Sequence, residues 1–197
     1  GIPMPVSVVI GHHPALYLAA TTRGAYEMDE LELAGTLLKE PLDVVTSETS
    51  DLLIPADSEI VLEGEVPLQE FKEEGPFGEF QGYYFLNPKP VHVFNVKAVT
   101  MRKDAIFKNL QSHPMTEAGI FHRVPIGIGV YNHIKDVEGG VKIHNVQVFP
   151  SNFIVVIQMT PTEEGQAKNV MLSALSSPFL HPKIAIAVDE DVDIFDP

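Results

Sequence analysis

The sequence of 197 residues contains no cysteine, which excludes disulfides, thiolate catalysis and cysteine-ligated zinc. No apolar run reaches the roughly 18 residues that a membrane-spanning helix needs, and no signal peptide is visible at the start. Arginine is scarce, with only Arg23, Arg102 and Arg123 in the chain. These features predict a cytoplasmic protein that does not enter a membrane.

The charge of the chain is strongly acidic. Asp and Glu number 27 against 13 Lys and Arg, so the formal net charge at pH 7 is −14. Nucleic acid binding needs clustered basic residues, and this balance argues against it. Hydrophobic residues make up 45% of the chain, which with its length predicts one globular domain with a proper core. Because the chain starts at Gly1 without a methionine and stops at Pro197 just after a strand-like run, we expect residues 1–197 to be the central part of a longer protein whose N-terminal and C-terminal segments are missing.

Hydrophobic periodicity predicts mostly strands, with a few helices between them. The β-branched run Val6–Ile10 predicts a buried strand, and Pro14 can begin a helix that continues to Ala20. A second helix is expected over Asp29–Leu38, with acidic residues at its positive end. Further strands are predicted at 42–45, 59–66, 91–99, 105–107, 141–148, 152–159 and 183–188, and further helices at 120–134 and 162–175. This mixture predicts an α+β domain built on an antiparallel sheet or barrel.

The segment Glu73–Phe80, with sequence EEGPFGEF, points most directly to chemistry. It places the carboxylates of Glu74 and Glu79 on either side of a Gly-Pro-Phe-Gly turn. Proline fixes one φ angle and glycine takes backbone angles closed to other residues, so the loop can be both bent and rigid. Two carboxylates held close together raise the pKa of one of them and leave a proton donor near neutrality. The alternative interpretation is an acidic turn whose carboxylates face water.

This segment and the Gly82-Tyr83-Tyr84 that follows resemble the catalytic loop of the UbiD family of decarboxylases, which use a prenylated flavin. Three further stretches resemble the family in order and spacing. They are a strand-to-helix turn beside the cofactor (Val8–Ala15), a strand pair before the catalytic loop (Asp51–Ala56 and Glu59–Gly64) and the strand that ends the central domain (Ile184–Asp193). Together they span nearly the whole chain.

The resemblance implies a fold, a reaction and partners. The fold would be a split β-barrel like that of flavin reductases, with covering helices. In the family, an aromatic or α,β-unsaturated carboxylic acid adds to prenylated FMN and loses CO₂, in a reversible reaction without oxidation. Glu79 would then protonate the carbon left behind, and Glu74 with an arginine would tune that proton. A flavin prenyltransferase would supply the cofactor, and the full-length protein would form a homo-oligomer.

The resemblance also implies residues that hold the cofactor and metal ions. Glu30 would bind a divalent ion, Mn²⁺, that bridges to the cofactor phosphate, because carboxylate and phosphate oxygens suit a hard cation. Backbone carbonyls around Ala19, Ala20 and Thr22 would line a K⁺ site and contact the cofactor. The alternative for Glu30 is an ordinary acidic residue that interacts with the dipole at the start of a helix.

The histidines give no metal site of their own. His12 and His13 are adjacent on an extended segment, so their side chains point in opposite directions and cannot easily bind one ion. The other histidines show no spacing of four residues on a helix, and zinc chemistry is therefore unsupported. A structural role, or a place in the cofactor wall, is the interpretation for the first pair.

The chain also departs from the family pattern. The family's catalytic arginine, and the Asn and His that complete its metal site, lie upstream of the segment that begins here. No arginine of the chain falls at the matching place. A carboxylate pair without its arginine holds its proton more tightly, and a metal with one protein carboxylate binds weakly. We therefore expect the chain alone to have little or no decarboxylase activity.

Two other functions stay open. The first is a non-catalytic scaffold that descends from such an enzyme and binds flavin mononucleotide or phosphate, and the missing arginine favours it. The second is a flavin reductase, which would share the barrel. Electron transfer through a flavin has no need for the paired carboxylates of Glu74 and Glu79, so the sequence disfavours the reductase.

Overall fold

The computed structural model describes residues 1–24, 26–113, 115–179 and 181–196, and it divides the chain into two compact units. Unit 1 comprises residues 1–19, 29–78 and 84–110. Unit 2 comprises residues 20–28, 79–83 and 111–197. The prediction that residues 1–197 form the central domain of a longer chain stays a prediction.

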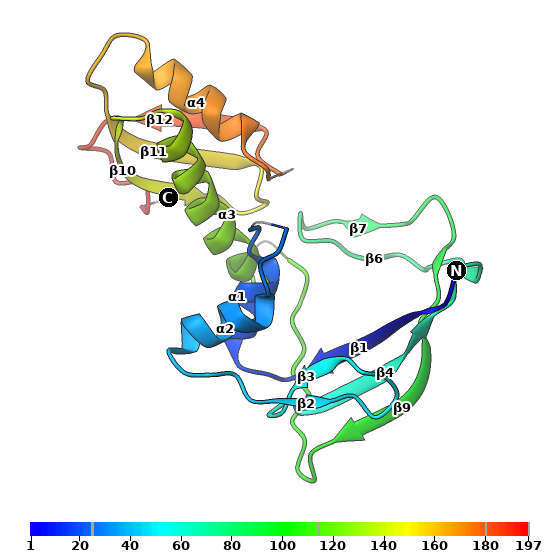
Figure 1. Ribbon diagram of the computed structural model, residues 1–197. Helices are drawn as coiled ribbons and strands as arrows, with labels where there is room; N and C mark the ends of the chain where they lie inside the picture. Colours follow the sequence, from blue (N-terminus) through cyan, green and yellow to red (C-terminus); the bar gives the residue numbers. More distant parts are fainter. Residues whose placement is uncertain (25, 114, 180, 197) are drawn as a thin grey trace. The chain divides into compact units, whose positions relative to one another are not determined.

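Unit 1 is built on a three-stranded antiparallel sheet in the order β1-β4-β9 (Figure 1). Its strands are β1 (Met4–Ile10), β4 (Ile60–Val66) and β9 (Asn95–Met101). The predicted strand 91–99 is in fact two elements, because β8 (Val91–His92) ends before β9 begins. The strand predicted at 105–107 is wrong. There the backbone N–H of Ile106 donates to the carboxylate of Glu59 at 3.0 Å, so a side chain and not a neighbouring strand takes this hydrogen bond.

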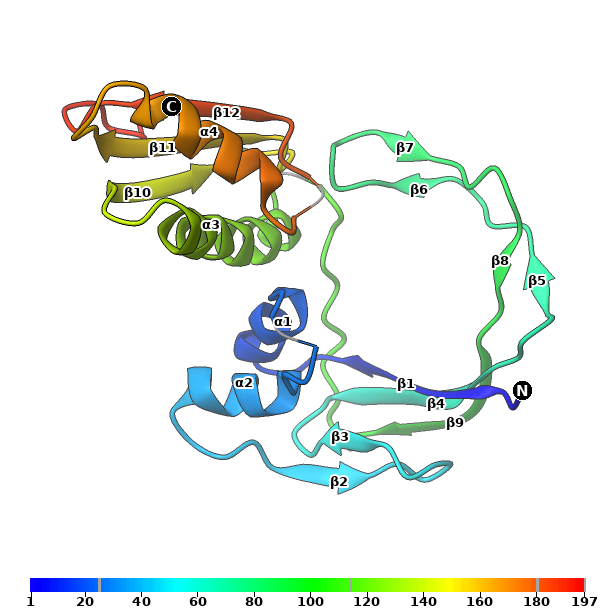
Figure 2. The same cartoon turned by 45° about the horizontal axis from the view of Figure 1, so that its top comes forward.

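Three short two-stranded ladders complete the β structure of unit 1 (Figure 2). They pair β2 (Val44–Thr46) with β3 (Leu53–Pro55), β5 (Phe71–Lys72) with β8, and β6 (Phe77–Gly78) with β7 (Tyr84–Phe85). The strands among the described residues form open sheets and ladders and no closed barrel. The α+β class is therefore confirmed. These pairings do not establish the split barrel, which stays a prediction.

Two helices lie at positions that local sequence signals predict. Helix α1 (Pro14–Thr21) begins at the expected proline, and His13 Nδ1 accepts a hydrogen bond from the N–H of Ala15 at 3.1 Å. Helix α2 (Glu30–Leu38) is capped by Asp29, whose carboxylate accepts from the N–H of Leu31 at 2.8 Å. Both caps satisfy backbone donors that the first turn of a helix leaves unpaired.

Unit 2 packs two helices on one face of a second three-stranded sheet. Strands β10 (Lys142–Val148) and β11 (Ile154–Thr160) form an antiparallel hairpin, and β12 (Ile184–Val188) lies parallel to β11. A parallel neighbour needs a long crossover connection, and α4 (Gln166–Ser176) supplies it. Helix α3 (Glu117–Val137) precedes the hairpin, and no helix among the described residues is long and apolar enough to cross a membrane.

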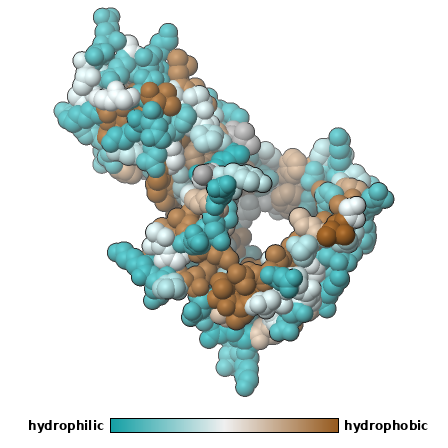
Figure 3. Space-filling model, in the orientation of Figure 1, coloured by the Kyte–Doolittle hydropathy of each residue, from teal (hydrophilic) through white to brown (hydrophobic). Residues whose placement is uncertain are grey.

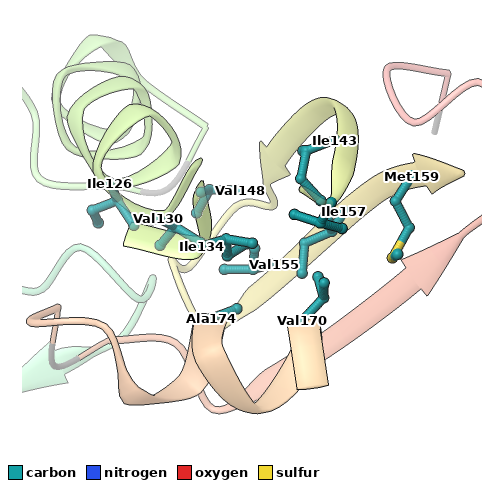
Figure 4. Packing of buried hydrophobic residues seen from close by; sticks show 11 residues of the cluster. Ile126, Val130, Ile134, Ile143, Val148, Val155, Ile157, Met159, Val170 and Ala174 are labelled. Carbon is teal, nitrogen blue, oxygen red and sulfur yellow. The ribbon is translucent and has the colours of Figure 1, made fainter. Parts of the chain in front are cut away.

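The core of unit 2 is a single apolar cluster between these helices and the sheet (Figure 4). Alternate residues of β11 point to one face of the sheet, so Val155, Ile157 and Met159 are all buried on the side of the helices. The helices contribute Ile126, Val130, Ile134, Val170 and Ala174 to the same cluster. This core fixes the positions of α3 and of the segment that leads into β12.

Candidate functional site

The loop predicted to carry the catalytic carboxylates folds as a hairpin. Phe77 pairs with Phe85 and Gly78 with Tyr84. The second half of the turn expected at residues 75–78 therefore forms strand β6. The turn itself is residues 79–83, where the N–H of Glu79 donates to the carbonyl of Tyr83 at 2.8 Å. Gly82 closes the turn with a φ of 91°, which is a conformation that glycine adopts without a steric penalty. Glu79 therefore lies at the start of a hydrogen-bonded turn.

Within unit 2, the turn that begins with Glu79 is surrounded by aromatic rings. The ring of Phe80 lies 5.1 Å from the ring of His181 and 6.1 Å from that of His122, between centroids. The ring of Phe153 is 6.5 Å away in an edge-to-face arrangement. The carboxylate Oε1 of Glu79 accepts a hydrogen bond from the N–H of Phe80 at 2.8 Å. The half-buried Glu79 thus directly precedes a phenyl ring that lies beside two imidazoles and a second phenyl ring.

Burial and nearby charges set the protonation of the two imidazoles beside Phe80. Burial is the main cause that lowers the pKa of His122, while the negative charge of Glu79 acts in the opposite direction. Burial is also the main cause that lowers the pKa of His181. The basic groups of His122, Lys183 and Arg23 lower it further, and Glu79 again acts in the opposite direction. Both imidazoles are therefore neutral near pH 7. A neutral imidazole can accept a proton at one nitrogen and donate one from the other.

Two further polar groups belong to unit 2 near this turn. Gln81 has a buried side-chain oxygen without a hydrogen-bond partner among the described residues. A buried acceptor of this kind is costly unless a ligand or water donates to it. The guanidinium of Arg23 donates to the carbonyl of Pro178. This contact holds the segment before His181.

Glu74 belongs to unit 1, where its carboxylate accepts a hydrogen bond from the side chain of Asn87 at 3.2 Å. The side chain is exposed. Glu79 belongs to unit 2. The predicted pairing of the two carboxylates therefore stays a prediction.

The residues predicted to hold the cofactor and metal have varied surroundings. Ala19 is fully buried, Ala20 is exposed and Thr22 is partly buried at the end of α1. Glu30 is exposed in the first turn of α2. In the described part of the chain, no three His, Asp or Glu side chains gather to hold a metal ion. Glu30 alone supplies one carboxylate, which does not make a metal site, and these roles stay predictions.

The sequence did not reveal His122, His181 or Gln81 as parts of the site. Helix α3 carries His122, and the segment before β12 carries His181, so both are distant from Glu79 along the chain. Neither histidine has a spacing that a motif search would detect. The signal that brings them together is tertiary, since it depends on how the turn 79–83 lies within unit 2.

Family models match almost the whole chain. Residues 1–114 match the UbiD model, described as the 3-octaprenyl-4-hydroxybenzoate carboxy-lyase Rift-related domain. Residues 120–197 match UbiD_C, the 3-octaprenyl-4-hydroxybenzoate carboxy-lyase C-terminal domain. The chain belongs to the UbiD family. The resemblance inferred from the catalytic loop is therefore confirmed, and the boundary between the two models lies close to residue 111, where the long segment of unit 2 begins.

Individual UbiD relatives agree with this assignment. The chain is 33% identical to a phenolic acid decarboxylase of Bacillus subtilis over 99% of its own length and 42% of the relative. It superposes on the UbiD-class enzyme HmfF of Pelotomaculum thermopropionicum in complex with prFMN, with a TM-score of 0.89 and 32% identity over 100% of this chain and 46% of the other. A vanillic acid decarboxylase of Sedimentibacter hydroxybenzoicus gives a TM-score of 0.87 and 32% identity, over 98% and 42% of the two chains. The chain thus spans less than half the length of these relatives.

Proposed function

We propose that this chain is the cofactor-binding core of a prenylated-FMN-dependent decarboxylase. Its substrates are aromatic or α,β-unsaturated carboxylic acids, and the reaction is reversible. The observation that carries the proposal is the placement of the half-buried Glu79 directly before Phe80, whose ring lies beside the rings of His122 and His181, so that the charge of Glu79 acts on both imidazoles. The solved UbiD-class neighbour with prFMN supports the choice of cofactor. The proposed architecture is the family's split barrel.

Glu79 is the proposed proton donor. Its Oε1 accepts from the backbone N–H of Phe80, so the proton of the neutral acid resides on Oε2. A carboxyl group in its neutral form can deliver a proton to carbon. Prenylated FMN, when bound, supplies the electron sink for the loss of CO₂. The role of the protein is to hold the proton at the place where carbon needs it.

His122 and His181 are proposed to relay a proton from solvent to the Glu79 carboxylate, each ring taking up a proton at one nitrogen as it releases the proton from the other. Both imidazoles have a pKa lowered by burial and are influenced by the charge of Glu79. A group that is neutral at working pH and close to a carboxylate suits proton exchange with it. Phe80 and Phe153 are proposed to offer apolar ring surfaces against an aromatic acid, because offset and edge-to-face ring contacts are favourable.

The metal and the second carboxylate complete the proposal. Glu74 is proposed as the partner that tunes Glu79. Glu30 is the proposed ligand for Mn²⁺, and Ala19, Ala20 and Thr22 the proposed contacts of cofactor and K⁺. Because no three His, Asp or Glu side chains among the described residues gather to hold a metal ion, no chemical step is assigned to either ion. For the same reason, the chain alone is proposed to be inactive or nearly so.

Loading and catalysis can be tested in turn. Native mass spectrometry of the chain produced with a flavin prenyltransferase and Mn²⁺ should show a mass increment for prenylated FMN. Decarboxylation of a panel of cinnamic, phenolic and furoic acids is then followed, for the chain and for the longer protein of which it is the proposed core. Glu79→Gln in the longer protein should lower turnover by about 100-fold to 10,000-fold while the cofactor spectrum persists. The matched control Glu164→Gln, at an exposed site of unit 2, should leave turnover unchanged.

The results separate the proposal from its alternative. Full turnover in Glu79→Gln would show that Glu79 is not the proton donor. Bound flavin without turnover of any acid, even in the longer protein, would favour the non-catalytic scaffold. Turnover by the chain alone at the rate of the longer protein would contradict the proposed inactivity.

A further inference from the structure

A groove of about 540 Å³ lies in unit 1 between α2 and the β2–β3 ladder. Its floor is apolar, with Leu31, Leu42, Val44 and Leu53 among the lining residues. Val44 and Leu53 remain 38% and 55% exposed. Figure 3 shows hydrophobic residues gathered on this face over β2 and β3. An exposed apolar patch beside a groove is typical of a binding surface.

The backbone of β2 offers a free edge beside this groove. The carbonyl of Asp43 accepts from Ala56 at 2.9 Å, and the N–H of Ser47 donates to Leu52 at 2.8 Å. In an antiparallel ladder, backbone groups alternate in direction along the strand. The N–H and C=O groups of Val44 and Thr46 therefore point away from β3.

No other strand in the described part of the chain pairs with β2. All three of its residues, Val44–Thr46, have exposed side chains. An exposed strand edge is a ready template for an added strand from another segment. The edge is short, so an added strand would need further contacts to bind firmly, and the apolar groove beside it provides them.

The charges that line the groove indicate the charge of the segment that would bind there. Asp29, Glu32 and Glu40 line it, against the single positive charge of Lys39. A basic segment would therefore be attracted. A second copy of the chain is a poor occupant, because its net charge of −14 would oppose association.

We propose that this groove binds an extended, basic polypeptide segment, which adds a strand to the free edge of β2. Backbone hydrogen bonds to Val44 and Thr46 fix the register of the segment. Its apolar side chains enter the groove between α2 and β3, and its Lys or Arg side chains lie against Glu32 and Glu40. The binding of such a segment would be a function beyond the proposed decarboxylation.

The test uses the 197-residue chain and an acetylated peptide of alternating valine and lysine as the probe. Titration followed by NMR should shift the amide signals of β2 and α2 and slow the hydrogen exchange of the Val44 and Thr46 amides. A matched peptide of alternating valine and glutamate should bind at least about tenfold more weakly, because the charges then repel. Affinity for the basic peptide should fall as ionic strength rises from about 0.01 M to about 0.15 M.

Two variants separate backbone recognition from charge. Val44→Pro removes an outward N–H but none of the bonds to β3, and proline is tolerated at such edge positions. It should weaken binding at least about tenfold, with the Val45 amide still protected as a check that the ladder persists. Glu32→Lys combined with Glu40→Lys should weaken binding to a similar extent, whereas Glu164→Lys, in unit 2, should not.

Three results would overturn the proposal. The first is equal binding of the basic and acidic peptides. The second is unchanged affinity in Val44→Pro, which would show that no strand is added. The third is concentration-dependent protection of Val44 and Thr46 without any peptide, which would identify a second copy of the chain as the occupant.

Discussion

The ring of Phe80 meets the ring of His181 edge to face, with centroids 5.1 Å apart and planes inclined at 88°. Such a contact contributes about 0.5–1.5 kcal/mol beyond the area it buries. Because Phe80 follows Glu79 directly, the contact fixes the turn that carries the proposed proton donor. The position of Glu79 thus depends on a ring that comes from the segment before β12.

Replacement of Glu79 by Gln should lower the pKa of both His122 and His181. The Glu79 carboxylate raises the pKa of each imidazole against the larger effect of burial, so its neutralisation leaves burial less opposed. NMR titration of the imidazole signals would measure the shift. Glu164→Gln is the control, because no charge at Glu164 contributes to either histidine. Unchanged histidine titrations in Glu79→Gln would show that the charge of Glu79 does not affect the pKa of either imidazole.

Local signals in the sequence predicted much of the fold. Pro14 begins α1 as expected, and Asp29 caps α2 through its own side chain. Both depend on neighbouring residues alone. The segment from Glu73 to Tyr84 was predicted to be a catalytic loop from its resemblance to the UbiD family, with its turn at residues 75–78. The turn forms at 79–83, because cross-strand pairing of Phe77 with Phe85 extends the strands and Gly82 supplies the positive φ.

The rest of the site depends on contacts that no local pattern encodes. His122 and His181 come beside Phe80 only because α3 and the segment before β12 are held by the core of unit 2. The false strand at 105–107 has a similar origin. Its apolar residues are typical of a strand, yet the carboxylate of Glu59 captures the N–H of Ile106. Tertiary contacts override local propensity in both cases.

Ser47→Ala should destabilise unit 1 through the buried carboxylate of Glu63. Glu63 is fully buried, and its Oε2 accepts from Ser47 Oγ at 2.5 Å and from the N–H of Thr49 at 3.0 Å. The hydrogen bond from Ser47 is the main cause that lowers the pKa of Glu63. Loss of a hydrogen bond to a buried charge costs about 1–3 kcal/mol. Urea denaturation at pH 7 followed by circular dichroism would measure the loss.

The pH dependence of the Ser47→Ala effect follows from the same shift. A carboxyl group with a lowered pKa in the folded state stabilises the protein above its unfolded pKa, and this contribution is lost as pH falls through the folded pKa. The difference between Ser47→Ala and the wild type should therefore shrink below about pH 4.5, the reference value for this carboxyl group. Thr162→Ala, at an exposed hydroxyl in unit 2, should show no such dependence. A difference that stays constant from neutral to acid pH would contradict the assignment.

Ile157→Ala should lower the free energy of unfolding of unit 2 by about 2–5 kcal/mol. Ile157 is fully buried between the sheet and its two helices, so removal of the side chain leaves a cavity that rigid neighbours cannot fill (Figure 4). Hydrogen exchange of the β10 and β11 amides would report the change for this unit alone. Ile128→Ala, at a site on α3 that is 58% exposed, is the matched control and should cost much less. Equal losses in the two variants would mean that the cluster is not a tightly packed core.

Gly64→Ala should disrupt the pairing of β4 with β9, because an added Cβ would overlap the backbone oxygen of Asn95. The register between these strands shifts at Glu63 and Gly64, where the backbones of the two strands come very close. The atom in the way belongs to the backbone, so a change of side-chain rotamer cannot relieve the overlap, and the cost should be about 3 kcal/mol, the upper end of the usual range for overpacking. Gly75→Ala is the control, since a Cβ there meets nothing within 4 Å. If hydrogen exchange of the β9 amides were the same in both variants, close backbone approach would not be the reason for glycine at position 64.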